Sequence, residues 1–142
     1  MAGYSGTPLI RKLGIKPDFD IAFINAPKNF INQLDLPSGV KIRSVSKSHD
    51  LDFILLFVKR RTVLNAAFAQ CAQKLKSNGM LWVSWPKQSS GVPTDLNENI
   101  VRDIGLTAGL VDVKVCAVDE IWSGLKFVYR LKDRPNLKPT RP

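Results

Sequence analysis

The feature that most constrains the fold is a continuous apolar run, FILLFV, at residues 53–58. Such a run is typical of a strand covered on both faces by helices. Apolar residues then recur at helical spacing, at Leu64, Phe68, Cys71 and Leu75. The letters SNG after this helix predict a left-handed stop at Asn78 or Gly79, and a second apolar run, MLWVSW, follows. The middle of the chain therefore predicts two parallel strands joined by a helix.

The flanking segments extend this pattern at both ends. Before the middle lie a buried strand DIAFIN, a short helix KNFINQL and a second strand VKIRSV. After it, Asp95 and Glu98 have the spacing of a capping box and predict a helix over DLNENIVRDIGLTAGL. Two alternating runs, VDVKVCAVD and LKFVYRL, close the chain, and the short connection between them predicts an antiparallel hairpin. Together these elements predict a three-layer α/β domain with a mostly parallel sheet.

Composition limits the function classes. With 142 residues, the chain suits one domain, for which we expect residues 1–131, followed by a flexible, basic, proline-rich tail at 132–142. A net charge of +9 favours anionic partners. No apolar run has membrane-spanning length, so we expect a soluble, cytoplasmic protein. The two cysteines and single histidine do not form a zinc motif, and we expect no metal site.

The order of elements is similar to a class I methyltransferase fold with its third strand removed, over about residues 17–131. The segments LDFILLFV and KSNGMLWVSW and the closing hairpin resemble that fold's fourth strand through its last. This resemblance implies a Rossmann-like sheet of six strands in the order 2-1-3-4-6-5, with the sixth strand antiparallel.

A narrower resemblance spans nearly the whole chain before the tail. The segments AGYSGTPLIRKLGIKP, NAP, WVSWPK, SGVPTD and GLVDVKVCAVDEIWSGLKFV resemble a family of small bacterial proteins known only as a domain of unknown function. That resemblance implies a fold and a bacterial origin, but it implies no activity.

Two departures from the methyltransferase pattern concern the cofactor. The glycine-rich turn that lets the backbone approach a nucleotide is replaced by Asn25, Ala26 and Pro27. Proline lacks an amide donor, and the side chains at 25 and 26 occupy space that glycine leaves open. The second strand ends in KIRSVSKS, with no carboxylate to bind ribose hydroxyls. We therefore predict no adenosyl cofactor.

A ligand site in such a sheet is expected beyond the carboxyl ends of the strands, where strand order reverses. An amide from the first turn and cations after the third strand could bind phosphate or carboxylate, and a Ser-Ser-Gly turn with a lysine could bind an anion. Trp85 comes at the end of the fourth strand, and we expect Trp122 and one acid from the turn of the closing hairpin near the same rim. The candidate ligand-binding residues are Asn25, Lys59, Arg60, Trp85, Lys87, Ser89, Ser90, Asp119 and Trp122.

The sequence favours a non-enzymatic domain that binds a small anion or an acidic partner at this rim. One alternative is an enzyme that uses S-adenosylmethionine or a nucleotide through an atypical cofactor loop. Another is non-specific binding of nucleic acid through the basic surface and tail, although the basic residues are not interleaved with exposed aromatic residues. No catalytic residue is predicted.

Overall fold

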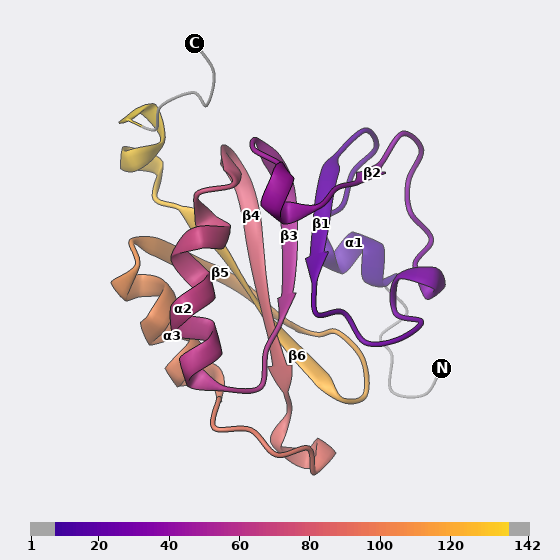
Figure 1. Cartoon of the computed structure of the whole chain (residues 1–142), viewed down its shortest axis with the longest axis vertical. Helices are drawn as coiled ribbons and strands as arrows, with labels where there is room; N and C mark the ends of the chain where they lie inside the picture. The colour runs from indigo at the N-terminus through magenta and orange to yellow at the C-terminus, as the bar shows by residue number, and fades with distance from the viewer. Residues whose placement is uncertain (1–7, 137–142) are drawn as a thin grey trace.

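The structure, a computed structural model, describes residues 8–136 and contains a six-stranded sheet in the order β2-β1-β3-β4-β6-β5 (Figure 1). Strands β2, β1, β3 and β4 are parallel, and β6 runs antiparallel to both β4 and β5. This arrangement confirms the predicted strand order and the predicted closing hairpin. The strands are β1 (Asp20–Ile24), β2 (Lys41–Ile42), β3 (Leu51–Phe57), β4 (Leu75–Pro86), β5 (Leu110–Ala117) and β6 (Trp122–Tyr129).

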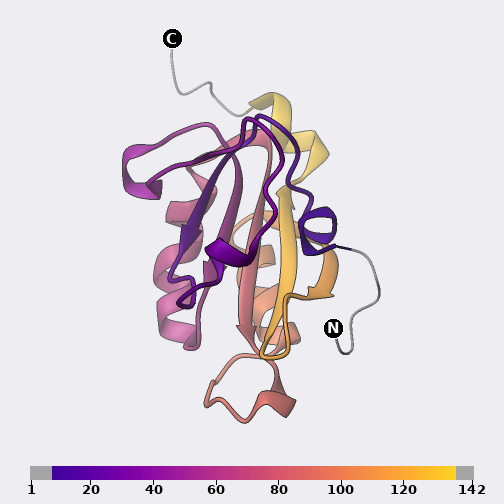
Figure 2. The same cartoon turned by 90° about the vertical axis from the view of Figure 1, so that its right-hand side faces the viewer.

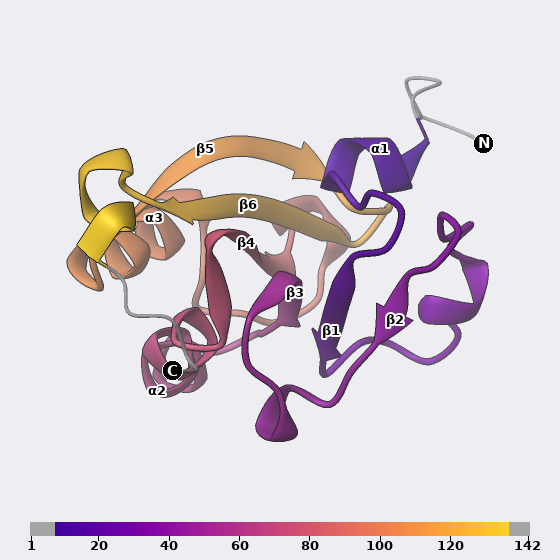
Figure 3. The ribbon, with the colours of Figure 1, turned by 90° about the horizontal axis from the view of Figure 1, so that it is seen from above.

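Helices cover both faces of the sheet and form a three-layer domain. Helices α2 (Arg61–Ala72) and α3 (Glu98–Thr107) lie on one face, and the short α1 (Leu9–Leu13) lies on the other (Figure 3). Between residues 8 and 136 the chain also forms four 3-10 turns: η1 (Ile31–Gln33), η2 (Val45–Lys47), η3 (Gln88–Ser90) and η4 (Leu131–Asn136). The loop that contains η3 and the turn η4 lie at opposite ends of the molecule (Figure 2).

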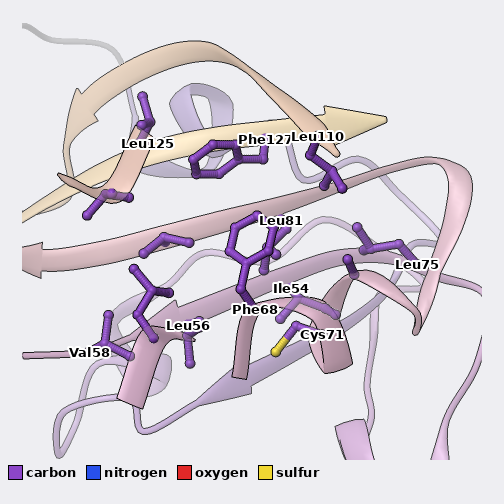
Figure 4. Close-up of a cluster of buried hydrophobic side chains, with 14 of the residues drawn as sticks. Ile54, Leu56, Val58, Phe68, Cys71, Leu75, Leu81, Leu110, Leu125 and Phe127 are labelled. Carbon is purple, nitrogen blue, oxygen red and sulfur yellow. The ribbon is translucent and has the colours of Figure 1, made fainter. Parts of the chain in front are cut away.

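The core under α2 and α3 is built by apolar residues at strand and helix periodicity. Leu64, Phe68 and Cys71 of α2 are all buried in this core, as their spacing predicts. Figure 4 shows Phe68 and Cys71 among the side chains of this core. The ring of Phe68 meets that of Phe127 on β6 edge to face, with centroids 5.1 Å apart. Burial raises the pKa of the Cys71 thiol to about 11, so this cysteine is a packing residue.

The opposite face has a second core, in which aromatic residues pack together with aliphatic ones. Phe53, Phe57 and Trp82 project from the sheet, and α1 covers them through its buried Leu13. The indole Nε1 of Trp82 donates a hydrogen bond to the carbonyl of Leu13 (2.9 Å), which satisfies two buried polar groups at once. The short α1 is therefore held to the middle of the sheet by a specific contact as well as by packing.

The predicted end of α2 is wrong. The helix ends at Ala72, and Leu75 is the first residue of β4, where it pairs with Leu51. The chain then shifts register, so that Met80 pairs with Phe53. No left-handed residue occurs in the segment SNG; instead, a Cβ at Gly79 would lie 2.8 Å from the carbonyl oxygen of Leu51. Glycine is required at 79 because β3 and β4 approach each other closely there. The buried Leu75 is compatible with the strand as well as with the helical spacing.

Two further elements are shorter than the sequence predicts. Strand β2 contains only Lys41–Ile42, both exposed, and the segment KNFINQL forms only the 3-10 turn η1. Helix α3 begins after Asn97, whose side chain accepts a hydrogen bond from the amide of Ile100 (2.9 Å), so Asp95 is not its cap. The edge on the side of β1 and β2 is therefore mostly loop.

Strand β5 forms the other edge of the sheet. Its pairing with β6 shifts between Asp112 and Lys114, which leaves Val113 in a bulge and half exposed.

No helix within residues 8–136 has both the length and the apolar character to cross a membrane. The division into a domain and a flexible tail stays a prediction, because η4 occupies Leu131–Asn136 and residues 137–142 lie outside the described part.

Candidate functional site

The predicted site residues come from segments at the carboxyl ends of the parallel strands and from the hairpin between β5 and β6. These ends point the same way, downward in Figure 1, and the turn between β5 and β6 lies at the same edge. We call this edge the carboxyl rim. Its described segments are the turn after β1, the start of α2, the loop at 87–97 and the turn at 118–121. The rim is the place where open α/β sheets bind ligands.

The turn after β1 replaces glycine with asparagine. Asn25 has φ 60° and Asn29 has φ 68°, the left-handed conformation in which asparagine is the best tolerated side chain after glycine. The Asn25 side chain reaches across to β3, where its Nδ2 donates a long hydrogen bond to the carbonyl of Phe57 (3.4 Å). Because strand order reverses between β1 and β3, this amide spans the crevice in which a ligand would be expected.

The next residues fill the same crevice from the α1 face. Phe30 is 7% exposed, and its ring packs edge to face on Phe57, with centroids 5.1 Å apart. Phe23 on β1 contacts Phe30, and Trp122 on β6 contacts Phe57 at 5.0 Å. Edge-to-face contacts of this kind add to the free energy gained from burial. Aromatic side chains of the protein itself thus cover the carboxyl halves of β1 and β3 on this face.

The second strand offers no ribose-binding acid. Ile42 at its end is 48% exposed, and Arg43 follows it. The Arg43 Nε donates to Asp20 Oδ1 (3.1 Å), which directs this cation to the start of β1. The sequence already shows that no carboxylate ends this strand. The structure adds that Arg43, the residue after the strand, forms a salt bridge with Asp20.

Exposed cations dominate the turn from β3 into α2. Lys59, Arg60 and Arg61 are all exposed, and no salt bridge joins them to an acid within residues 8–136. Their backbone is nevertheless fixed: the Thr94 hydroxyl donates to the Lys59 carbonyl (2.6 Å), and Asp95 Oδ1 accepts from the Arg61 amide (2.7 Å). Asp95 therefore caps α2, the helix before it in the chain. Hydrogen bonds therefore hold the backbone of this turn in place, while its three cationic side chains are exposed.

The loop after β4 is closed by its own hydrogen bonds. The Ser90 hydroxyl donates to the Lys87 carbonyl (2.7 Å) and accepts from the Val92 amide (3.1 Å), so it completes a turn. Ser89 is exposed, and Lys87 is partly exposed. The Lys87 amide donates to the Ile121 carbonyl (2.7 Å) and ties this loop to the hairpin.

The two tryptophans do not form one platform. Trp85 is 5% exposed and belongs to the core under α2 and α3, whereas Trp122 is 8% exposed and belongs to the core under α1. The sheet lies between them. Each tryptophan is therefore a packing residue beneath the rim, on its own face of the sheet.

Asp119 is used by the hairpin turn. Its Oδ1 accepts hydrogen bonds from the amides of Ile121 and Trp122, both at 2.8 Å. In the described part of the chain, no salt bridge joins Asp119 or Glu120 to Lys87. The Asp119 carboxylate is therefore engaged with the backbone of its own turn.

The residues that sequence reasoning missed are Phe30 and Asp95. Phe30 lies in the segment KNFINQL, and its position over Phe57 depends on how the glycine-free turn folds back. Asp95 is a residue type that often caps helices, but the sequence does not show that it caps α2 through Arg61. The only signal for this partner is that Asp95 lies in a loop after a parallel strand.

A groove of about 300 Å³ lies elsewhere, between α2 and α3. Its lining residues are Asn65, Phe68, Ala69, Asp103, Ile104, Thr107 and Ala108, none of which belongs to the rim.

The architecture is similar to that of several solved methyltransferase structures. A methyltransferase from Aquifex aeolicus, described as SAM dependent, has TM-score 0.64 at 13% identity, covering 84% of this chain and 86% of its own. A precorrin-6y C5,15-methyltransferase from Geobacter metallireducens has TM-score 0.59 at 10% identity, covering 86% of each chain. A magnesium protoporphyrin IX methyltransferase from Synechocystis, solved with bound SAH, has TM-score 0.55 at 9% identity, covering 86% of this chain and 78% of its own.

These similarities define the fold alone: it is a class I methyltransferase-like, Rossmann-like fold. No protein-family profile matches the sequence, and no curated protein matches it. The predicted methyltransferase-like fold is therefore confirmed, whereas membership of a domain-of-unknown-function family and a bacterial origin stay predictions.

Proposed function

We propose that this chain is a methyltransferase-fold domain that has no adenosyl cofactor site and binds an acidic partner or small anion through the cations of its carboxyl rim. The observation that carries the proposal is the contact between the Asn25 side-chain amide and the Phe57 carbonyl, with Phe30 packed on Phe57. These groups occupy the β1–β3 crevice, the position at which the fold binds its ligands.

The electrostatics of the rim support an anionic partner. The exposed cations there are Lys28, Lys59, Arg60 and Arg61, and Lys87 adds a partly exposed charge. Of the rim acids, Asp95 accepts a hydrogen bond from the Arg61 amide, and Asp119 accepts hydrogen bonds from two amides of its own turn. These two carboxylates are therefore engaged with the backbone, which leaves Glu120 as the exposed acid of the turn at 118–121. The exposed ammonium and guanidinium groups outnumber it and can bind carboxylates or phosphates.

The first experiment is a titration of ¹⁵N-labelled protein with poly-glutamate, followed through its backbone amides. We expect shifts at residues 59–61 and 87–91, and loss of binding in the double variant Lys59→Ala/Arg60→Ala. The matched control is Lys47→Ala/Lys132→Ala, which removes the same charge from exposed positions at the other end of the strands. Equal weakening by both double variants would show that net charge alone causes binding, and would overturn a site at the rim.

A second titration, with S-adenosylhomocysteine at about 1 mM, tests the absence of a cofactor site. A ligand present at about one hundred times its Kd stabilises a folded domain by about 2.7 kcal/mol, so binding raises Tm by several degrees. We expect no change in Tm. A clear rise would favour the alternative, an enzyme with an atypical cofactor loop. An Asn25→Gly variant provides the comparison, because it removes the amide from the crevice and suits the positive φ.

A further inference from the structure

A second group of cations lies on the α1 face, away from the carboxyl rim. Lys114 on β5 and Lys126 on β6 are direct register partners across the hairpin. Directly opposed residues of an antiparallel pair project from the same face with their Cβ atoms close together. Like charges at such a pair oppose sheet formation. The hairpin therefore carries a repulsive pair in its middle, where an apolar or oppositely charged pair would stabilise it.

Helix α1 brings further cations to the same place. The Lys114 Nζ donates to the carbonyl of Lys12 at the end of α1 (3.0 Å), which leaves its remaining N–H donors free. Trp82, the partner of Lys126 on β4, holds the adjacent carbonyl of Leu13. The end of α1 is thus fixed over the hairpin. Lys12 lies close enough to Cys116, and Lys16 close enough to Lys126, for their charges to act on these groups.

The charges in this group are not neutralised by acids. Within residues 8–136, no salt bridge involves Lys12, Lys16, Lys114 or Lys126. Burial lowers the pKa of Lys126, and the charges of Lys114 and Lys16 lower it further. The carbonyls at the end of α1 carry only partial negative charge, so they reduce the repulsion without cancelling it. Departures from a favourable local pairing are expected at functional or strained sites of natural proteins.

We propose that Lys16, Lys114 and Lys126, with Lys12 beside them, form a binding site for the phosphoryl group of a small anion. A phosphate oxygen placed among these ammonium groups would accept several charge-assisted hydrogen bonds and relieve their repulsion. Lysine supplies such point charges without the fixed geometry of arginine. The site is separate from the rim, because none of its residues belongs to a rim segment, and it does not depend on the function proposed above.

The test is a titration with inorganic tripolyphosphate, followed through the backbone amides and the lysine side chains. We expect shifts centred on Lys16, Lys114 and Lys126, and a rise in the pKa of Lys126 on binding. The double variant Lys114→Gln/Lys126→Gln should weaken binding at least about tenfold, since each lost contact is charge-assisted. In the absence of ligand the same variant should have a higher Tm, because the cross-strand repulsion is removed.

Matched controls separate this site from its alternatives. The rim variant Lys59→Ala/Arg60→Ala should leave the shifts at Lys16, Lys114 and Lys126 and the affinity they report unchanged, because anion binding at the rim is a separate event that residues 59–61 report. The distant variant Lys47→Gln/Lys132→Gln should also leave binding unchanged. Equal weakening by the distant variant, or shifts spread over all exposed lysines, would show non-specific attraction and overturn the site. Binding to a single-stranded oligonucleotide with no response to tripolyphosphate would overturn a small-anion site in favour of a nucleic-acid surface.

Discussion

The indole N–H of Trp82 donates to the main-chain carbonyl of Leu13 across 69 positions of sequence, and both residues are fully buried. This hydrogen bond fixes the end of α1 on the sheet. Since the turn at Gly14 follows immediately, it also sets the path by which the chain enters β1. The contact places one polar interaction inside the apolar core of this face.

Replacing Trp82 with Phe should therefore destabilise the protein beyond the loss of buried area. The Leu13 carbonyl would lose its partner, which costs about 1–3 kcal/mol for a buried acceptor. Urea unfolding measures the loss, and amide hydrogen exchange should become faster in residues 9–15 than in α2. Uniform acceleration in both helices would show that Trp82 acts through general packing only.

Asp95→Ala should destabilise α2, although Asp95 lies well after that helix in the sequence. Its carboxylate caps the Arg61 amide at 2.7 Å, and loss of a cap costs about 0.5–2 kcal/mol. Asp95→Asn keeps an acceptor and should cost less. Chemical denaturation measures both variants; if Asn and Ala destabilise equally, the hydrogen bond to Arg61 does not contribute.

Two serines should respond in opposite directions to alanine. The Ser84 hydroxyl is fully buried on β4 and has no hydrogen-bond partner in the described part of the chain, whereas Ser90 makes two hydrogen bonds in its turn. Removal of an unpaired buried hydroxyl should raise the free energy of unfolding by about 1 kcal/mol, and Ser90→Ala should lower it by a similar amount. Destabilisation by Ser84→Ala would reveal a partner for that hydroxyl.

The stability difference between the wild type and Lys126→Gln should depend on pH. Burial and the neighbouring charges of Lys114 and Lys16 lower the pKa of Lys126 below its ordinary 10.5. Between these two pKa values the unfolded chain binds more protons, so the wild type gains stability as pH rises. The variant should be the more stable near neutral pH, and its advantage should shrink as pH approaches 10.5. A difference that stays constant over this range would show that Lys126 keeps an ordinary pKa.

The central strands and the closing hairpin could be predicted because the governing signals are local and strong, whereas the strand order was implied by the resemblance to the methyltransferase fold. The apolar run at 53–58 requires cover on both faces, and the short connection between the last two runs permits only an antiparallel pair. The end of α2 was predicted wrongly because Leu75 satisfies both a helical and a strand pattern. Its pairing with Leu51 is a long-range contact that periodicity does not report.

The candidate site was less accessible to sequence reasoning for a similar reason. The glycine-free turn was recognised, and its position at the β1–β3 reversal follows from the strand order. That Asn25 would adopt positive φ and reach Phe57 depends on the path of the chain after β1. The use of Asp119 and Ser90 within their own turns likewise depends on local geometry, which residue type alone does not determine.

The bulge in β5 also bears on how the protein behaves at high concentration. An edge strand of regular geometry presents a row of amides and carbonyls to which another chain can add. In β5 the register shift between Asp112 and Lys114 interrupts that row, and the lysine would place a charge at any such junction. The exposed valines at 113 and 115 are thereby kept from nucleating intermolecular sheet, so the fold carries its own protection against aggregation at its longest open edge.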